Sequence, residues 1–254
     1  MKPDIIKRLE KKVHRNLKLS SESFTIHNGP NHDKYVLDDQ NEIIALVLSN
    51  ADLGTFSDIK RFKKLKFLNV TKSNVTSLKY ISELKDLEVL FIGGNKIKDI
   101  SPLNNLDKLR SLKIWINPIK DYSPISRIKG LEVLDLEESN LKNLNLIENL
   151  HNLEYLNFAT NSIKDITLLS RLVKIEFLHA DNNRISDIST LEKLPLLKSL
   201  SLSGNKLKHI PQELSKKFNW LENSDREIGY KEIGISIKDN PLEFPPFSVI
   251  ETGS

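Results

Sequence analysis

The chain has 254 residues, of which 39% are hydrophobic and 28% charged, a composition typical of a soluble globular protein. It contains no cysteine, which excludes disulfide scaffolds, cysteine-bound zinc and thiolate nucleophiles and fits a reducing compartment. Lysine and arginine exceed aspartate and glutamate by 38 to 34, an excess too small to indicate a nucleic-acid partner before it is located along the chain.

The first 20 residues interrupt every short apolar run with charged or polar groups, so they lack the continuous apolar region of a signal peptide. No later stretch approaches the roughly 18 apolar residues that a membrane span needs. We therefore expect a soluble, cytoplasmic protein that does not bind membranes.

Residues 1–42 are expected to form an N-terminal cap. Ile5, Leu9 and Val13 recur at a spacing of four, which predicts an amphipathic helix. The segments 23–27 and 34–37 flank Asn28-Gly29-Pro30, a sequence that favours a β-hairpin. Helix and hairpin together would shield the apolar end of the first repeat.

An eleven-residue pattern, Leu-x-x-Leu-x-Leu-x-x-Asn-x-Leu, dominates residues 43–210. Within it the period of two predicts a strand, and the apolar residues three apart that follow suit a tight helical turn. A unit this short cannot bury its own leucines, so neighbouring units must stack. We predict an α/β solenoid with a curved parallel β-sheet on the concave face and 3-10 or short helical turns and loops on the convex face. The eight copies begin, at steps of 22 residues, at Ile43, Leu65, Leu87, Leu109, Leu131, Leu153, Ile175 and Leu197.

The asparagine position of the pattern is expected to bond the backbone where the chain leaves each strand. Ala51, Ser73 and Ser139 depart from it, so we expect their turns to be held less firmly. The asparagines at this position are Asn95, Asn117, Asn161, Asn183, Asn205 and Asn240.

Residues 211–254 form an irregular repeat and a C-terminal cap. The period breaks after residue 210, where Trp220 and Tyr230 appear. A ninth, shorter copy then follows, with Ile235, Ile237 and Asn240 in frame. The phrase NPLEFPPFSVIETG follows, and its three prolines are expected to close the ladder.

The phrases NKIKDISPLNNLDKLRSL and NSIKDITLLSRLVKIEFL resemble the leucine-rich-repeat family, specifically the 22-residue bacterial repeats of internalins. The resemblance extends from about Ile43 to Phe247. The NPLEFPP phrase resembles the end of the repeat domain in larger bacterial proteins, such as Roco-type GTPases, in which another domain follows. The resemblance therefore implies a repeat domain that could belong to a larger signalling protein.

Motifs of catalysis are absent from the sequence: no HExxH, P-loop, nucleophile elbow or dinucleotide fingerprint occurs. Gly93-Gly94 falls where a tight turn leaves a strand, which favours a turn over a phosphate site. His179, two residues from Asp181 and two repeats from Asp135, could form an acid–base or metal site, but a contact residue is the favoured interpretation. We expect no catalytic residue, no metal and no cofactor.

Repeat positions three, five and seven of the sheet are expected to face solvent. They hold six aromatic or imidazole side chains, the kind that dominates binding hot spots. An alternative is that third-position side chains such as Val89, Val133 and Phe177 pack sideways and stabilise the sheet. The candidate partner-binding residues are Phe67, Phe91, Lys113, Trp115, Asp135, Glu137, Tyr155, Phe177, His179 and Asp181.

Charge on this face is uneven. The first four repeats place basic residues near the aromatic ones, whereas the fifth to seventh carry seven carboxylates that would repel phosphates along the concave face. The basic residues are Lys66, Lys72, Arg110 and Lys113, and the acidic residues are Glu132, Asp135, Glu137, Glu138, Glu154, Glu176 and Asp181.

The sequence thus predicts a non-catalytic protein-interaction module whose partner has an apolar protrusion and a basic patch. It would serve as the sensing or regulatory repeat domain of a larger bacterial protein. The alternative is an internalin-like secreted or surface adhesin, which would require export. Nucleic-acid binding by the basic exterior is a weaker hypothesis that predicts a steep salt dependence. Partner, pathway and oligomeric state are left open.

Overall fold

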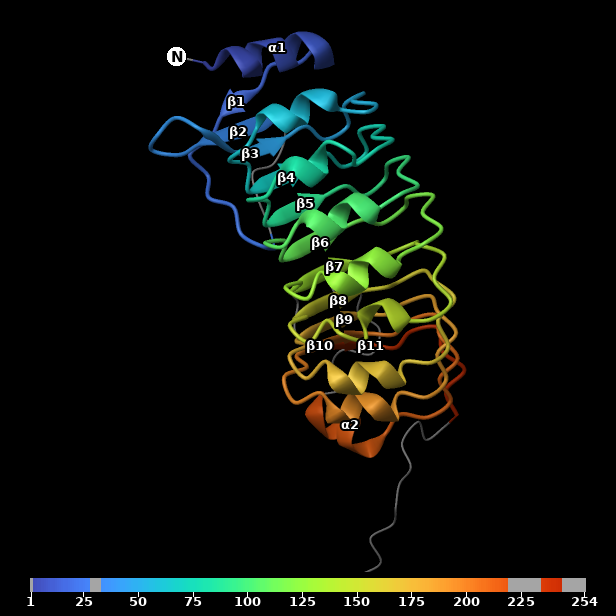
Figure 1. Ribbon diagram of the computed structural model, residues 1–254. Helices are drawn as coiled ribbons and strands as arrows, with labels where there is room; N and C mark the ends of the chain where they lie inside the picture. Colours follow the sequence, from blue (N-terminus) through green and yellow to red (C-terminus); the bar gives the residue numbers. More distant parts are fainter. Residues whose placement is uncertain (1, 28–32, 219–233, 244–254) are drawn as a thin grey trace, which may run out of the picture. The chain divides into compact units, whose positions relative to one another are not determined.

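The computed structural model describes residues 2–27, 33–218 and 234–243 (Figure 1). The chain divides into two compact units, Met1–Asp135, here the N-terminal unit, and Leu136–Ser254, here the C-terminal unit. The expected turn at residues 28–30, Trp220, Tyr230 and the segment after residue 243 lie outside the described residues.

The described part of the N-terminal unit contains seven strands whose order in the sheet is their order in the sequence. From β3 to β7 every neighbouring pair is parallel, and a 3-10 helix connects each strand with the next. The elements are α1 (Asp4–Val13), β1 (Lys18–Leu19), β2 (Lys34–Leu37), β3 (Ile43–Val47), η1 (Ser57–Arg61), β4 (Phe67–Asn69), η2 (Ile81–Glu83), β5 (Val89–Phe91), η3 (Ser101–Asn105), β6 (Ser111–Lys113), η4 (Ser123–Arg127) and β7 (Val133–Asp135).

The described part of the C-terminal unit contains four strands, and each pairs in parallel with the next. A 3-10 helix precedes β8, β9 and β10, whereas the α-helix α2 stands between β10 and β11. The elements are η5 (Asn145–Ile147), β8 (Tyr155–Asn157), η6 (Thr167–Arg171), β9 (Phe177–His179), η7 (Ser189–Lys193), β10 (Ser199–Ser201), α2 (Gln212–Lys217) and β11 (Gly234–Ser236).

The N-terminal cap contains the expected helix but a different strand pairing. Of the expected stripe of α1 only Leu9 is fully buried, because Ile5 and Val13 are half-buried and Ile6 is buried beside Leu9 instead. The expected hairpin between residues 23–27 and 34–37 is wrong, because 23–27 form no strand. Instead β2 pairs antiparallel with β3 and parallel with β1, because the sheet edge presented by β3 offers it a full backbone ladder.

Strand pairing follows the 22-residue frame. Phe67 pairs with Val89 and Leu68 with Leu90, each 22 residues further along the chain. The inward leucine positions are fully enclosed, as Leu87 and Leu90 show at 0% exposure. This register confirms the expected fold class, a repeat solenoid with parallel strands and 3-10 helices between them. None of the described helices has the length and apolar character needed to cross a membrane.

The asparagine position holds successive repeats together. Asn95 accepts hydrogen bonds from the backbone N–H of Ser73 and Val75 through Oδ1, both at 2.9 Å. Its Nδ2 donates to the carbonyl oxygens of Val70 and Ile92 at 3.0 and 2.8 Å. One buried side chain thereby satisfies four backbone groups that no regular element could pair. In the C-terminal unit Asn183 makes equivalent bonds.

Aspartates fix the start of several 3-10 helices. Asp121 accepts a 2.8 Å hydrogen bond from the backbone N–H of Ser123. This bond and a second one from the Ser123 side chain hold the pKa of Asp121 below its usual value. The Asp165 carboxylate does the same for Thr167 in the C-terminal unit, so short polar caps define the convex-side turns at the repeat period.

Candidate partner-binding surfaces

Repeat positions three, five and seven form one surface of the sheet in each unit, called here the outer face. All ten candidate contact residues lie on it. The expectation that their aromatic and imidazole rings face solvent is wrong for five of the six rings. The exposed fractions are 0% for Phe67, 7% for Phe91, 3% for Tyr155, 9% for Phe177 and 8% for His179.

Two causes explain this burial. Parallel strands lie only about 4.8 Å apart, so side chains at the same repeat position cover one another. Val89 and Val133, at 1% and 0% exposure, show the sideways packing considered as the alternative. In the N-terminal unit the chain adds a second cover of its own.

Residues 20–27 lie over the outer face of the N-terminal unit. In Figure 1 this blue segment leaves β1 and descends past β3 and β4 toward β5 and β6. Phe24 and Ile26 pack against a buried apolar cluster made of residues from β3, β4 and β5. The ring centroids of Phe24 and Phe67 are 5.4 Å apart, and those of Phe67 and Phe91 are also 5.4 Å apart. The cluster consists of Ala45, Val47, Phe67, Val89 and Phe91.

Trp115 is the one candidate ring that remains partly exposed. Its indole lies on the backbone of Gly93, where an added Cβ would meet three indole atoms, with Cδ2 at 2.5 Å. Gly93 and Trp115 occupy the same position of successive repeats, so the ring reaches back over the glycine. Lys72 Nζ lies 5.6 Å from the ring centroid on the same side, a cation–π contact.

Ile116, next to Trp115, is 44% exposed and has a φ of 46°. The eighth repeat position adopts this left-handed conformation in each of the eight repeats, and Asn50 and Gly94 suit it. A β-branched residue there is strained and places an apolar side chain in water. Trp115 and Ile116 together form an exposed apolar pair, called here the apolar rim.

Lys113 serves the covered face rather than the solvent. Its Nζ lies 4.6 Å from the Phe91 ring centroid and donates a 3.4 Å hydrogen bond to the carbonyl oxygen of His27. Asp135, the acidic candidate of this unit, is only 8% exposed. Arg110 makes two 2.6 Å hydrogen bonds to the carboxylate of Glu132, so the basic character of this face is reduced.

The outer face of the C-terminal unit is polar where that of the N-terminal unit is apolar. Tyr155 and His179 stack with ring centroids 5.3 Å apart. Burial lowers the pKa of His179, and the Asp181 charge opposes that effect only in part. The buried Nε2 atom has no hydrogen-bond partner, so nothing at this atom offsets the cost of burying a charged imidazolium.

Asp181 and Glu137 line a shallow hollow of about 350 Å³ at the ends of the strands in the C-terminal unit. Asp181 Oδ1 accepts hydrogen bonds from Ser201 Oγ at 2.5 Å and from the Ser203 backbone N–H at 2.8 Å. Glu137 is exposed. The two carboxylates keep acidic character at this edge, although Lys238 also lines the hollow. Among the described residues, no group of three potential ligands is arranged to hold a metal ion.

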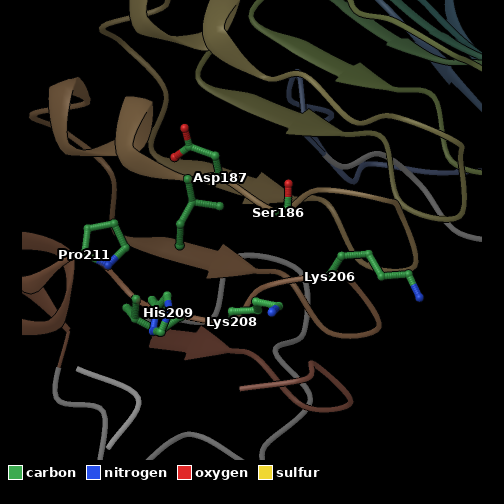
Figure 2. A pocket seen from close by; sticks show the side chains of 8 residues that line it. Ser186, Asp187, Lys206, Lys208, His209 and Pro211 are labelled. Carbon is green, nitrogen blue, oxygen red and sulfur yellow. The ribbon is translucent and has the colours of Figure 1, made fainter. Parts of the chain in front are cut away.

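A second hollow in the C-terminal unit, of about 420 Å³, lies between two successive turns that follow the strands (Figure 2). Asp187 comes from one turn, and Lys208 and His209 from the next. Lys208 Nζ lies 3.0 Å from the carboxylate of Glu243, which balances its charge, and His209 Nε2 lies 3.4 Å from the same carboxylate. Similar hollows recur at equivalent turns in both units. This hollow is therefore a feature of the repeat geometry rather than a special site.

The family comparison agrees with the repeat frame. A family described as Leucine Rich repeats (2 copies) matches residues 85–127 and 173–216, which include β5, β6, β9 and β10. The chain has the fold of a leucine-rich-repeat solenoid, and these two stretches are similar to that family. Repeat domains of this family are typically non-catalytic and bind proteins or peptides. No curated protein sequence matches the chain.

Solved structures of leucine-rich-repeat proteins share the fold. An internalin (inlF) from Listeria monocytogenes is 28% identical with a TM-score of 0.67. The match covers 80% of this chain and 56% of that internalin. Internalin C2 from the same species is 25% identical with a TM-score of 0.68, covering 85% of this chain and 90% of its own. The ectodomain of the Arabidopsis receptor kinase GASSHO1/SCHENGEN3, solved with CASPARIAN STRIP INTEGRITY FACTOR 2, is 22% identical with a TM-score of 0.59. It covers 82% of this chain, which spans 28% of the receptor chain, and it shares the fold alone.

The sequence did not identify Ile116 and the pair Phe24 and Ile26 as parts of the outer surface. Ile116 could have been found, because the eighth repeat position otherwise holds residues that accept a left-handed backbone or are polar. Phe24 and Ile26 lie outside the repeat frame, so no periodic signal points to their contact with the sheet.

Proposed function

We propose that this leucine-rich-repeat chain is a non-catalytic protein-binding module that contacts its partner through the apolar rim of the N-terminal unit. The observation that carries the proposal is the combination of Trp115, seated on Gly93, with the strained and exposed Ile116. Aromatic anchors fixed on a rigid backbone are the usual centres of binding energy. Strain at an exposed residue indicates that its side chain is retained for a contact.

The partner is expected to present an apolar protrusion to the apolar rim. Lys72 beside Trp115 favours an acidic group next to that protrusion. A basic patch on the partner would match Glu137 and Asp181 of the C-terminal unit. These are separate contacts, and each has its own test.

Affinity capture from cells that encode the chain tests the proposal. Trp115→Ala should abolish capture of a protein that the unmodified chain retains, since hot-spot substitutions cost about 2 kcal/mol or more, roughly 30-fold in affinity. Val173→Ala, at another exposed apolar residue, is the matched control. Capture that persists in Trp115→Ala, with the circular dichroism spectrum unchanged, contradicts the apolar rim as the binding surface.

The acidic edge is tested by charge reversal of Glu137 to lysine. We expect weaker capture and a weaker dependence on salt, because an exposed carboxylate contributes mainly through long-range attraction. Reversal of the exposed Glu192 in η7, away from the outer face, serves as the control for net charge. Equal losses for both variants would assign the effect to net charge alone.

Our proposal includes a cytoplasmic location and a sensing or regulatory role within a larger bacterial protein, which the absence of cysteine supports. A second candidate, a secreted or surface adhesin, is favoured by the similarity to two Listeria internalins. Labelling of intact cells with a membrane-impermeant amine reagent separates them. Labelling of the protein on intact cells supports the adhesin, and labelling only after lysis supports the cytoplasmic role.

A further inference from the structure

The segment of residues 20–27 has the pattern of a bound extended peptide. Phe24 and Ile26 are partly buried against the apolar cluster. Ser23, before Phe24, and Thr25, between the two, are exposed. Alternating burial is the signature of an extended chain that lays one side on a surface. Yet the segment is not a strand of the sheet.

Its path runs across the strands. Phe24 contacts Phe67 in β4, and the carbonyl oxygen of His27 accepts a hydrogen bond from Lys113 in β6. Three residues span at most about 10 Å, close to two strand spacings, and the backbone bends at Ile26 and His27. The outer face of β4 to β6 therefore contacts residues 24–27 of the segment in a defined direction.

Ser20 N–H donates a 2.9 Å hydrogen bond to the carbonyl oxygen of Tyr35 and anchors the start of the segment beside β2. The apolar contacts further along come from two side chains that are only partly buried. Glu22 forms an exposed ion pair with Lys34 at 2.5 Å, and exposed pairs contribute little. The hydrogen bond from Lys113 to His27 is long, at 3.4 Å. A competing peptide with equal side chains could replace these contacts one for one.

We propose that the outer face of the N-terminal unit is a peptide-binding site that residues 20–27 occupy in cis. The peptide that replaces them is extended and carries an aromatic side chain and, two residues later, an aliphatic one. This proposal takes the chain to be a binding module, as in the proposed function, but it concerns a different surface from the apolar rim.

A labelled peptide tests it. Fluorescein-labelled SSESFTIH, the sequence of residues 20–27, is titrated into the full chain and into the Phe24→Ala/Ile26→Ala variant, and anisotropy is recorded. The double variant leaves the cluster open, so its dissociation constant should be at least ten-fold lower than that of the unmodified chain. Ser21→Ala/Ser23→Ala, at exposed positions of the same segment, should behave like the unmodified chain.

Specificity is checked with the peptide SSESATAH, which lacks both apolar side chains and should not bind. If the double variant keeps its circular dichroism spectrum but binds SSESFTIH no better than the unmodified chain, the site does not exchange and the proposal is wrong. If the double variant does not fold, Ile26→Ala alone decides: a three-fold gain in affinity supports the proposal, and no gain overturns it.

Adding Trp115→Ala to the double variant separates this proposal from the proposed function. The contacts that carry this proposal join Phe24 and Ile26 to the apolar cluster and His27 to Lys113, so the affinity for the peptide should not change. Loss of partner capture with peptide binding intact would show that Trp115 acts through the apolar rim alone. Loss of peptide binding with partner capture intact would show that Trp115 belongs to the peptide site.

Discussion

The outer face of the N-terminal unit carries a covered apolar cluster from β3 to β5, whereas the fifth-position residues of the C-terminal unit are polar. In the N-terminal unit the fifth-position residues Val47 and Phe91 belong to the apolar cluster against which Phe24 and Ile26 pack. The C-terminal unit has Asn157 and His179 at the same position. The inward leucine frame is the same in both. The inward leucines therefore determine the fold, while repeat positions three, five and seven can carry different side chains in each unit.

The polar face needs hydrogen bonds that the apolar face does not. Asn157 Oδ1 accepts a bond from the Ala159 backbone N–H at 2.9 Å, and Ser201 donates to Asp181. Buried polar groups without such bonds cost free energy, and the Nε2 atom of His179 is one of them. Both units carry such a cost, because the buried Ser111 Oγ on the outer face of the N-terminal unit also has no hydrogen-bond partner.

The largest effect should come from removing a third-position ring in each unit. Phe67→Ala should lower the free energy of unfolding by about 3–5 kcal/mol, and Phe177→Ala by about 2–3 kcal/mol. Phe67 is fully enclosed by Phe24 and Phe91, whereas Phe177 is 9% exposed. Urea denaturation measures both. Equal losses of unfolding free energy in the two variants would show that residues 20–27 add nothing to the burial of Phe67.

Gly93→Ala should come next, at about 1–3 kcal/mol, the usual cost of forcing extra atoms into a packed site. The new Cβ would displace the Trp115 indole from its seat. Gly130→Ala is the matched control, because its nearest neighbour, the carbonyl oxygen of Leu109, is 3.4 Å away. Thermal unfolding and partner capture are recorded together. A Gly93→Ala chain as stable as Gly130→Ala would show that the indole is not held by this seat.

Ile116→Asn should stabilise the chain by about 0.5–1 kcal/mol, since asparagine accepts the left-handed backbone that strains isoleucine. Asn50 and Asn182 already occupy the equivalent position, with φ of 57° and 52°. Thr160→Asn makes the same change in the C-terminal unit, where φ is 56°. Both should raise the melting temperature, but only Ile116→Asn should weaken partner capture. If Thr160→Asn also weakened partner capture, binding would not be specific to the apolar rim of the N-terminal unit.

The repeat frame was predictable from the sequence because its signal recurs every 22 residues. The pairing of Phe67 with Val89 and the bonds of Asn95 both follow from that recurrence. The same frame could have predicted that Trp115 lies over Gly93, since the two are one repeat apart and glycine leaves space for the ring.

Burial of the outer face could not be predicted in the same way. The contact between Phe24 and Phe67 joins residues outside and inside the repeats, so no period records it. Because residues 23–27 were expected to form a hairpin strand, their position across the face of the sheet was not predicted. The exposed aromatic surface expected from the sequence is consequently reduced to the apolar rim.

The smallest effect concerns pH and the polar face. Burial lowers the pKa of His179 from its ordinary value of 6.5, so protonation favours the unfolded chain. Stability contributed by the neutral imidazole is present above that ordinary value and is lost as the pH falls below it. We expect the unmodified chain to unfold at lower urea concentration at pH 5.5 than at pH 7.5. His179→Gln should reduce this difference, whereas the exposed His151→Gln should not. If His179→Gln shows the same loss of stability between pH 7.5 and pH 5.5 as the unmodified chain, the burial of His179 does not cause that loss.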